Sequence, residues 1–227
     1  MRKCLFFMFF LVILPLSAEA ETVYITADRD ATIIEYGASD CLNAVANGSG
    51  GFFFAGPNNQ PAGCSIRRGL IYFDVASVVP EKAIIESVAL NLYQSQGNLP
   101  PAMVGIYRVQ SEWSEGPSVA TGGIGAPAQQ GDVTWFHTYF DMDFWGQTGG
   151  NFIGRESASA LVGGNGWYRW EDSNHMVNDV RLWISNPGQN NGWVLIGEET
   201  QPQTAKRFAS RENSVVNLRP FLEISYR

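Results

Sequence analysis

The chain has 227 residues, of which 45% are hydrophobic and 16% charged, and its formal net charge is −7. This length and apolar content suffice for one sizeable hydrophobic core, which excludes a disordered chain and predicts a single domain. An acidic chain lacks the positive charge that phosphate backbones attract, so nucleic acid is excluded as an expected partner.

The first 20 residues predict a secretory signal peptide. Arg2 and Lys3 precede an apolar run from Leu5 to Leu14, and the segment ends in Ala18-Glu19-Ala20, a small-x-small cleavage pattern. The apolar run is shorter than the roughly 20 residues that a membrane helix needs. We therefore expect a secreted protein, extracellular or periplasmic, with one mature domain at 21–227 and no membrane insertion after cleavage. Losing two positive charges and one negative charge takes the formal net charge to −8.

Export changes the cysteine count from three to two. Cys4 lies in the predicted signal peptide, which leaves Cys41 and Cys64 in an oxidising compartment. Two cysteines in such a compartment are expected to form a disulfide. The intervening sequence, CLNAVANGSGGFFFAGPNNQPAGC, is rich in Gly, Asn and Pro. We therefore expect a cross-linked loop with the core strands outside it.

Short apolar segments separated by turn residues recur along the mature chain and have the length and composition of strands. They lie at 22–26, 70–75, 87–93, 103–109, 193–197 and 221–226. Apolar and polar residues alternate in 87–93 and 221–226, which predicts strands buried on one face.

One helix is predicted near the C-terminal third of the chain. Met176, Val180, Trp183 and Ile184 recur at helical spacing, and Asn186-Pro187-Gly188 predicts the end of the helix. One helix among many strands favours an all-β fold, an antiparallel β-sandwich of jelly-roll type.

The stretch GDVTWFHTYFDMDFW, residues 131 to 145, is dense in aromatic side chains. If this stretch formed a strand, both of its faces would carry large side chains, which is typical of a strand inside a sandwich or under covering loops. Val133, Trp135, His137 and Tyr139 would line one face, and Thr134, Phe136, Thr138 and Phe140 the other. The Gly-rich stretch before it, 116–131, predicts a long loop of the kind that often displays function.

Five segments in order resemble the secreted DNRLRE-domain family, which overlaps with carbohydrate-binding module family 96. They are RRGLIYFDVASVVPEKAIIESVALNLY, VGIYRVQSEWSEG, GDVTW, NDVRLWISNPGQNNGWVLIGEE and RFASRENSVVNLRPFLEISYR. The resemblance runs from about Thr22 to the C-terminus and implies a jelly-roll β-sandwich associated with polysaccharide or cell-surface material. It also implies structural roles for Trp113-Ser114-Glu115, Val133-Thr134-Trp135 and Asp179-Val180, with Trp135 facing the core.

Four aromatic residues are candidates for stacking on sugar rings, because they lie in Gly- and Asn-rich surroundings that are not typical of strand interiors. They are Trp145, Trp167, Tyr168 and Trp170, and Arg155, Arg169, Glu171 and Asp172 are candidate polar contacts around them. The alternative is that these aromatic residues cap the ends of the sandwich as satellite clusters.

Two aspartate pairs are candidate cation ligands, because residues two apart on a strand point the same way. Asp28 and Asp30 are the better pair for a structural calcium ion, and Asp141 and Asp143 are the other. Neither pair has the remaining ligands of a known calcium loop, so solvated surface charge is the alternative. No other cofactor is expected.

The sequence contains no motif of a known catalytic centre, and we expect no enzymatic activity. A hydrolase would have to draw on Asp141, Asp143, Glu171 and Asp172, and a lyase on His137 with Tyr139. The leading hypothesis is a secreted, non-catalytic module that binds polysaccharide or a cell-surface glycan. The alternatives are a secreted polysaccharide-degrading enzyme and an adhesion or matrix protein that binds another protein.

Overall fold

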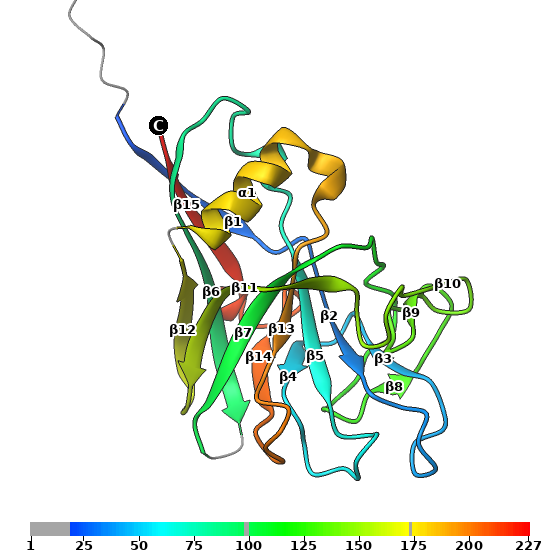
Figure 1. Cartoon of the computed structure of the whole chain (residues 1–227). Helices are drawn as coiled ribbons and strands as arrows, with labels where there is room; N and C mark the ends of the chain where they lie inside the picture. The colour runs from blue at the N-terminus through cyan, green and yellow to red at the C-terminus, as the bar shows by residue number, and fades with distance from the viewer. Residues whose placement is uncertain (1–18, 98–99, 173) are drawn as a thin grey trace, which may run out of the picture.

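Two antiparallel sheets pack face to face, and the chain passes repeatedly from one to the other (Figure 1). The structure is a computed structural model that describes residues 19–97, 100–172 and 174–227. All strand pairs in these ranges are antiparallel, and one α-helix accompanies them. The predicted fold class, an antiparallel β-sandwich with one helix, is confirmed. The predicted signal peptide lies, but for its last two residues, outside the described ranges.

Sheet A is buried on its inner face only. Its strands, in spatial order, are β1 (Glu21–Thr26), β15 (Phe221–Tyr226), β6 (Ile85–Gly97), β14 (Lys206–Ala209) and β4 (Phe52–Ala55), and β12 (Gly166–Glu171) pairs with the other edge of β6. Leu90 and Leu92 of β6 and Leu222 and Ile224 of β15 are buried in the core. The residues between them face outward, so the alternation in the sequence is explained by one buried face.

The central strands of sheet B are buried on both faces. Sheet B contains, in spatial order, β11 (Phe152–Val162), β7 (Ala102–Val109), β13 (Trp193–Ile196), β5 (Arg67–Tyr72), β2 (Arg29–Ile34), β3 (Val45–Asn47) and β8 (Ala126–Pro127). Ile71 and Leu195 pack towards sheet A, whereas Leu70 and Val194 belong to a second hydrophobic cluster on the opposite face. This is why β5 and β13 read as continuous apolar runs.

The residues between β7 and β11 cover this second face of sheet B. Trp113, Trp135 and Trp145 are buried there, and the indole N–H groups of Trp113 and Trp145 donate to the carbonyls of Asn191 and Thr134, each at 2.9 Å. Trp135 is therefore buried, as predicted, but in this covering layer and not between the sheets, and Trp113 is buried beside it.

The expected continuous strand over 133–140 is wrong. Only β9 (His137–Tyr139) and β10 (Asp143–Phe144) are strands, and they pair with each other in a short hairpin. The Thr134 hydroxyl accepts hydrogen bonds from the backbone N–H groups of Phe136 and His137 at 3.3 and 3.1 Å. A side chain that binds its own following backbone favours a turn over a strand.

The helix α1 (His175–Ser185) closes one end of the sandwich, at the top of Figure 1. Asp172 Oδ1 accepts the N–H groups of Asn174 and His175 at 2.8 and 2.5 Å, which satisfies the start of the helix. Trp183 packs on Trp193 of β13 with ring centroids 4.5 Å apart. The helix ends before Pro187, as predicted, and three 3-10 turns complete the fold: η1 (Val75–Ser77), η2 (Pro187–Gln189) and η3 (Val216–Leu218).

The predicted disulfide between Cys41 and Cys64 is present. The segment that it closes is more ordered than we expected, because it contains β3 and β4, and Phe53 of β4 is fully buried in the main core. The expectation that no core strand lies in this segment is wrong.

Reduction of this disulfide should lower the free energy of unfolding by about 3 kcal/mol, because the closed loop restricts the unfolded chain. Chemical denaturation with and without reductant, together with Cys41→Ala/Cys64→Ala protein, measures this loss. Hydrogen exchange should show faster exchange in β3 and β4 than in β6 of the reduced protein. Equal stability of the two forms would contradict this prediction.

Trp170 is part of the core and not of a loop. It lies on β12 with its side chain fully buried, and its indole N–H donates to the Val104 carbonyl at 2.6 Å. We expect Trp170→Ala to cost about 3–5 kcal/mol of stability, the usual range for removing a buried aromatic side chain. Urea denaturation measures this, and a loss below about 1 kcal/mol would contradict the core role.

Candidate functional site

Four aromatic side chains form a connected row on the outer face of sheet A, which we call the aromatic row. Its members come from four neighbouring strands: Tyr24 from β1, Phe221 from β15, Tyr93 from β6 and Trp167 from β12. Each occupies an outward position that alternates with a core residue, such as Leu92 beside Tyr93. The row therefore follows from the pleat of a sheet that buries one face.

The rings of the aromatic row contact one another without lying in a single plane. Ring centroids are 6.0 Å apart for Tyr24 and Phe221, 5.4 Å for Phe221 and Trp167, and 5.6 Å for Trp167 and Tyr93. The interplanar angles are 65°, 60° and 73°, the edge-to-face geometry that aromatic quadrupoles favour. Tyr24 is 67% exposed and Trp167 45% exposed, so these two rings offer most of the apolar surface.

Charged side chains lie on the same face of sheet A, two residues further along β12 and β15. Arg169 of β12 donates to both carboxylate oxygens of Glu223 on β15, at 2.8 and 3.2 Å, and to Glu171 at 2.6 Å. Hydrogen bonds from Arg169 hold the pKa of Glu223 below its usual value, so that carboxylate stays ionised near neutral pH. Apolar rings beside fixed donors and acceptors are what recognition of a sugar requires: a flat apolar contact and oriented hydrogen bonds.

The structure brings only one of the predicted sugar-binding residues, Trp167, to this row. Trp145 is buried under the covering layer of sheet B and Trp170 between the sheets, so the prediction that they face a ligand is wrong. The Tyr168 hydroxyl accepts the Gly163 N–H and donates to the Gly164 carbonyl, which fixes the turn before β12. Arg155 is exposed on β11, in the other sheet.

Tyr24, Tyr93 and Phe221 were missed, although the sequence contained a signal for them. In β6 and β15, the residues that alternate with the core leucines must point outward, and Tyr93 is one of them. The Gly and Asn residues around Trp167 and Trp170 predict a loop, in which both indoles could contact one sugar chain. As a strand, Gly166–Glu171 sends them to opposite faces, since they lie three residues apart.

The carboxylates considered for catalysis do not share a site. Asp141 and Asp143 lie at the β9–β10 hairpin, whereas Glu171 contacts Arg169 and Asp172 caps α1, on the other side of the molecule (Figure 1). Paired carboxylates for glycoside cleavage must flank one bond. His137 forms a 3.0 Å hydrogen bond between Nδ1 and the Thr134 hydroxyl and stacks on Phe144 with ring centroids 4.2 Å apart.

The predicted calcium ligands also point to different partners. Asp28 Oδ2 accepts the Asp74 N–H and Asp30 Oδ2 accepts the Arg211 N–H, each at 2.7 Å. Within the described ranges, no group of three or more His, Cys, Asp or Glu side chains is arranged to hold a metal ion. The positive charge of Arg211 lies near Asp30 and would repel a cation bound there. Each of the two carboxylates is engaged with a backbone N–H group.

Asp30 is instead a buried acid at the end of sheet B. Burial raises the pKa of its carboxyl well above the usual value, the hydrogen bond from the Arg211 N–H lowers it, and the nearby Glu212 and Glu115 raise it further. The pKa of the Glu212 carboxyl is raised by burial as well.

The raised pKa values of Asp30 and Glu212 predict that the contributions of these two groups to stability fall as the pH rises above about 4. The unfolded Asp30 carboxyl loses its proton near pH 3.9, whereas the folded one keeps it to higher pH, so the stabilisation is complete below 3.9 and is lost through the window above it. A fully titrating group gives a slope of about 1.4 kcal/mol per pH unit.

Asp30→Asn should remove this falling contribution, so that between pH 4 and 7 its stability declines less steeply, or rises more steeply, than that of the wild type. Urea denaturation over this range measures the slope. The matched control is Asp28→Asn, an exposed carboxylate at the same strand end, which should keep the wild-type slope. The same pH dependence in Asp30→Asn and in the wild type would contradict the prediction.

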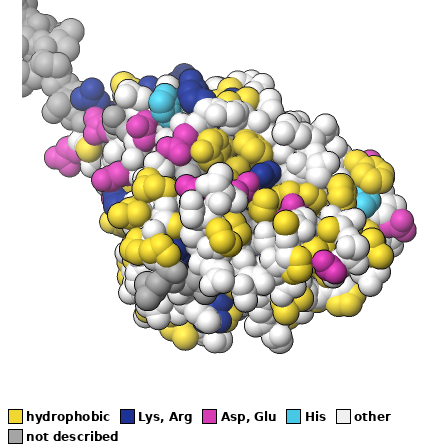
Figure 2. Space-filling model, turned by 60° about the horizontal axis from the view of Figure 1, so that its bottom comes forward, with side chains coloured by type: hydrophobic (Ala, Val, Ile, Leu, Met, Phe, Trp, Pro, Cys, Tyr) yellow, Lys and Arg dark blue, Asp and Glu magenta, His cyan; other side chains and the backbone are white. Residues whose placement is uncertain are grey.

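A second group of exposed apolar side chains lies at the β9–β10 hairpin. Met142 is 61% and Phe144 70% exposed. Figure 2 shows hydrophobic side chains gathered beside a histidine at this end, separated from the groups on the other side of the view. This second group lacks the bidentate ion pair found beside the aromatic row, so the aromatic row is the better candidate for a polar ligand.

Comparisons with known proteins add no relative. No family model matches the chain, and a search of curated proteins finds no significant similarity. In the described part of the chain, every helix is too short or too polar to cross a lipid bilayer.

Proposed function

We propose that this protein is a secreted, non-catalytic module that binds a polysaccharide or a cell-surface glycan through the outer face of sheet A. The observation that carries the proposal is the aromatic row, in which four rings from four strands meet beside the Arg169–Glu223 pair. An extended face with rings in succession suits a chain of repeating sugar units better than a single small molecule.

Three further observations support the proposal. The sequence resembles the DNRLRE-domain family, which overlaps with carbohydrate-binding modules. The N-terminal segment has the pattern of a signal peptide, and the Cys41–Cys64 disulfide is typical of exported proteins. The formal net charge of −7 and the mixed charges beside the row favour a hydroxyl-rich ligand over nucleic acid.

The tilt of the rings limits the kind of glycan. Successive rings are inclined by 60° to 73°, so they do not form one flat plate for the surface of a crystalline polymer. Tyr24 and Trp167, the two exposed rings, would instead contact separate sugar units of a single chain. We therefore expect a soluble, extended glycan chain as the ligand.

Trp167→Ala and Tyr24→Ala should each weaken glycan binding about tenfold, since each removes an exposed apolar contact of roughly 1.4 kcal/mol. A glycan array identifies the ligand, and calorimetric titration then measures the affinity of each variant. The melting temperature should change little, because neither residue is buried in the core.

The matched control is Phe144→Ala, which removes an equally exposed aromatic side chain at the β9–β10 hairpin. It should bind as the wild type does. Loss of binding in Phe144→Ala with full binding in Trp167→Ala would move the site to the hairpin. Unchanged binding in a folded Trp167→Ala/Tyr24→Ala protein would contradict the proposed function.

A further inference from the structure

A pocket of about 380 Å³ opens beside the aromatic row, where β1 ends and β15 begins. Thr26 of β1 and Phe221 of β15 form its near wall, and these two residues are direct cross-strand partners. Thr26 is exposed and lies two residues from Tyr24 on the same strand, so this wall belongs to the outer face of sheet A. The volume falls within the range of small-molecule sites.

The far wall of the pocket comes from the segment between β14 and β15, which is fixed before any ligand binds. The buried side chain of Asn213 donates to the Gly51 carbonyl at 2.9 Å and accepts the Val215 N–H at 3.0 Å, and the Asn213 carbonyl accepts Arg219 Nε at 3.0 Å. A preformed pocket loses little entropy on binding. The lining residues from this segment are Arg211, Val216, Asn217, Arg219 and Pro220.

The lining combines apolar surface with hydrogen-bonding groups, as a sugar requires. Phe221 and Val216 supply apolar surface, and Val216 is 64% exposed at the rim. Thr26, Asn217 and Arg219 supply a hydroxyl, an amide and a guanidinium, all of which can donate to hydroxyl oxygens.

The positive charge of Arg211 is offset by two carboxylates next to it. Its guanidinium donates to both carboxylate oxygens of Glu115, at 2.8 and 2.6 Å, and Glu212 Oε1 lies 2.8 Å from its Nε. The pocket therefore presents hydrogen-bond donors with little net charge. This favours the hydroxyl groups of a neutral sugar over an oxyanion.

The pocket adjoins the middle of the aromatic row and not its end. The Phe221 ring that lines it contacts Tyr24 on one side and Trp167 on the other, with ring centroids 6.0 and 5.4 Å apart. A sugar chain that entered the pocket by its end would leave Tyr24 or Trp167 uncovered. A branch on an internal unit would reach the pocket while the chain covers both rings.

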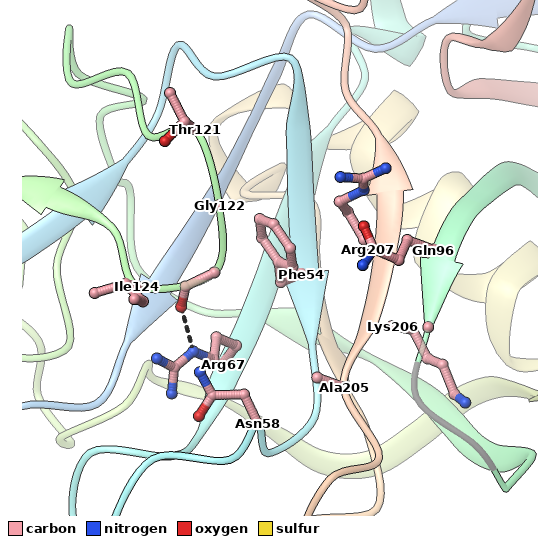
Figure 3. Close-up of a pocket in the computed structure, with 12 residues that line it drawn as sticks. Phe54, Asn58, Arg67, Gln96, Thr121, Gly122, Ile124, Ala205, Lys206 and Arg207 are labelled. Atoms are coloured by element: carbon pink, nitrogen blue, oxygen red, sulfur yellow. Dashed lines mark hydrogen bonds between the residues drawn. The ribbon is translucent and has the colours of Figure 1, made fainter.

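Another pocket on sheet A does not adjoin the aromatic row. It lies between β14 and the loop 121–124, and Figure 3 shows Arg67 and Arg207 on opposite sides of Phe54. Its described lining includes no member of the aromatic row. The pocket beside Phe221, in contrast, shares a wall with the row.

We propose that the pocket beside Phe221, which we call the branch pocket, binds a single neutral sugar unit carried as a branch on a glycan that lies along the aromatic row. The proposal rests on the proposed function and narrows its ligand from an extended glycan to a branched one. Asn217 and Arg219 would donate to the hydroxyl oxygens of the branch, and Phe221 and Val216 would contact its apolar part.

The test is calorimetric titration of the whole protein with unbranched and singly branched oligosaccharides of the same backbone. The pairs are mannohexaose and its galactosylated form, xylohexaose and its arabinosylated form, and laminarihexaose and its form with one glucosyl branch. In each pair that binds, the branched member should bind about tenfold more tightly, because the branch adds contacts that the row alone does not offer.

Two exposed valines next to each other in the chain supply a variant and its control. Val216→Trp fills the branch pocket from its rim and should remove the preference for the branched member, with the affinity for the unbranched member unchanged. Val215 is 53% exposed and lies outside the lining, so Val215→Trp should keep the preference.

Three results would overturn the branch pocket, and they separate it from the proposed function. Equal affinities within every pair that binds would overturn the branch pocket and leave the proposed function in place, provided that Trp167→Ala weakens both members. An undiminished preference in Val216→Trp would overturn it as well. Binding of no oligosaccharide from the three pairs would count against the proposed function and overturn the branch pocket with it.

Discussion

The central strands of sheet B, β13, β5 and β2, are removed from water on both faces, and the arrangement of the segment that covers them follows from that burial. Leu70 and Val194 face away from sheet A and would be exposed if only two layers were present. At roughly 25 cal/mol per Å² of apolar surface, leaving that face bare would be costly. The segment between β7 and β11 covers it with Trp113, Trp135 and Trp145.

The covering layer can be buried because the indole N–H groups of two of its tryptophans form hydrogen bonds. The indoles of Trp113 and Trp145 each donate to a backbone carbonyl, so their burial leaves no unpaired N–H. The outer face of sheet A is left open, and it carries the aromatic row. The covering segment also supplies the loop 121–124, which lines a pocket together with Phe54 and Arg207.

Much of the fold could be predicted from the sequence because single-face burial leaves a clear pattern. The alternation in β6 and β15 indicated half-buried strands, and the helical spacing from Met176 to Ile184 indicated α1. The hairpin at β9 and β10 could not be predicted from period alone, because the side chain of Thr134 decides the backbone there.

The sites were harder to predict than the fold, for two physical reasons. In Gly166–Glu171 the neighbouring glycines suggested a loop, whereas pairing with β6 makes a strand and buries Trp170 while exposing Trp167. The pocket beside the loop 121–124 is lined by residues of β4, β5 and β14 that are far apart in the chain, so it appears only after folding.

The accessibility of the tryptophan side chains reports most directly on the covering layer of sheet B and on the aromatic row. All seven lie in the described ranges, and Trp167 alone is exposed, at 45%, whereas the other six are at most 7% exposed. Hydrogen exchange of the seven indole N–H groups, followed by nuclear magnetic resonance of the ¹⁵N-labelled protein, tests this directly. We expect the indole N–H of Trp167 to exchange far faster than those of the other six tryptophans. Exchange of Trp113 or Trp145 as fast as Trp167 would show that sheet B is not sealed and would contradict the account.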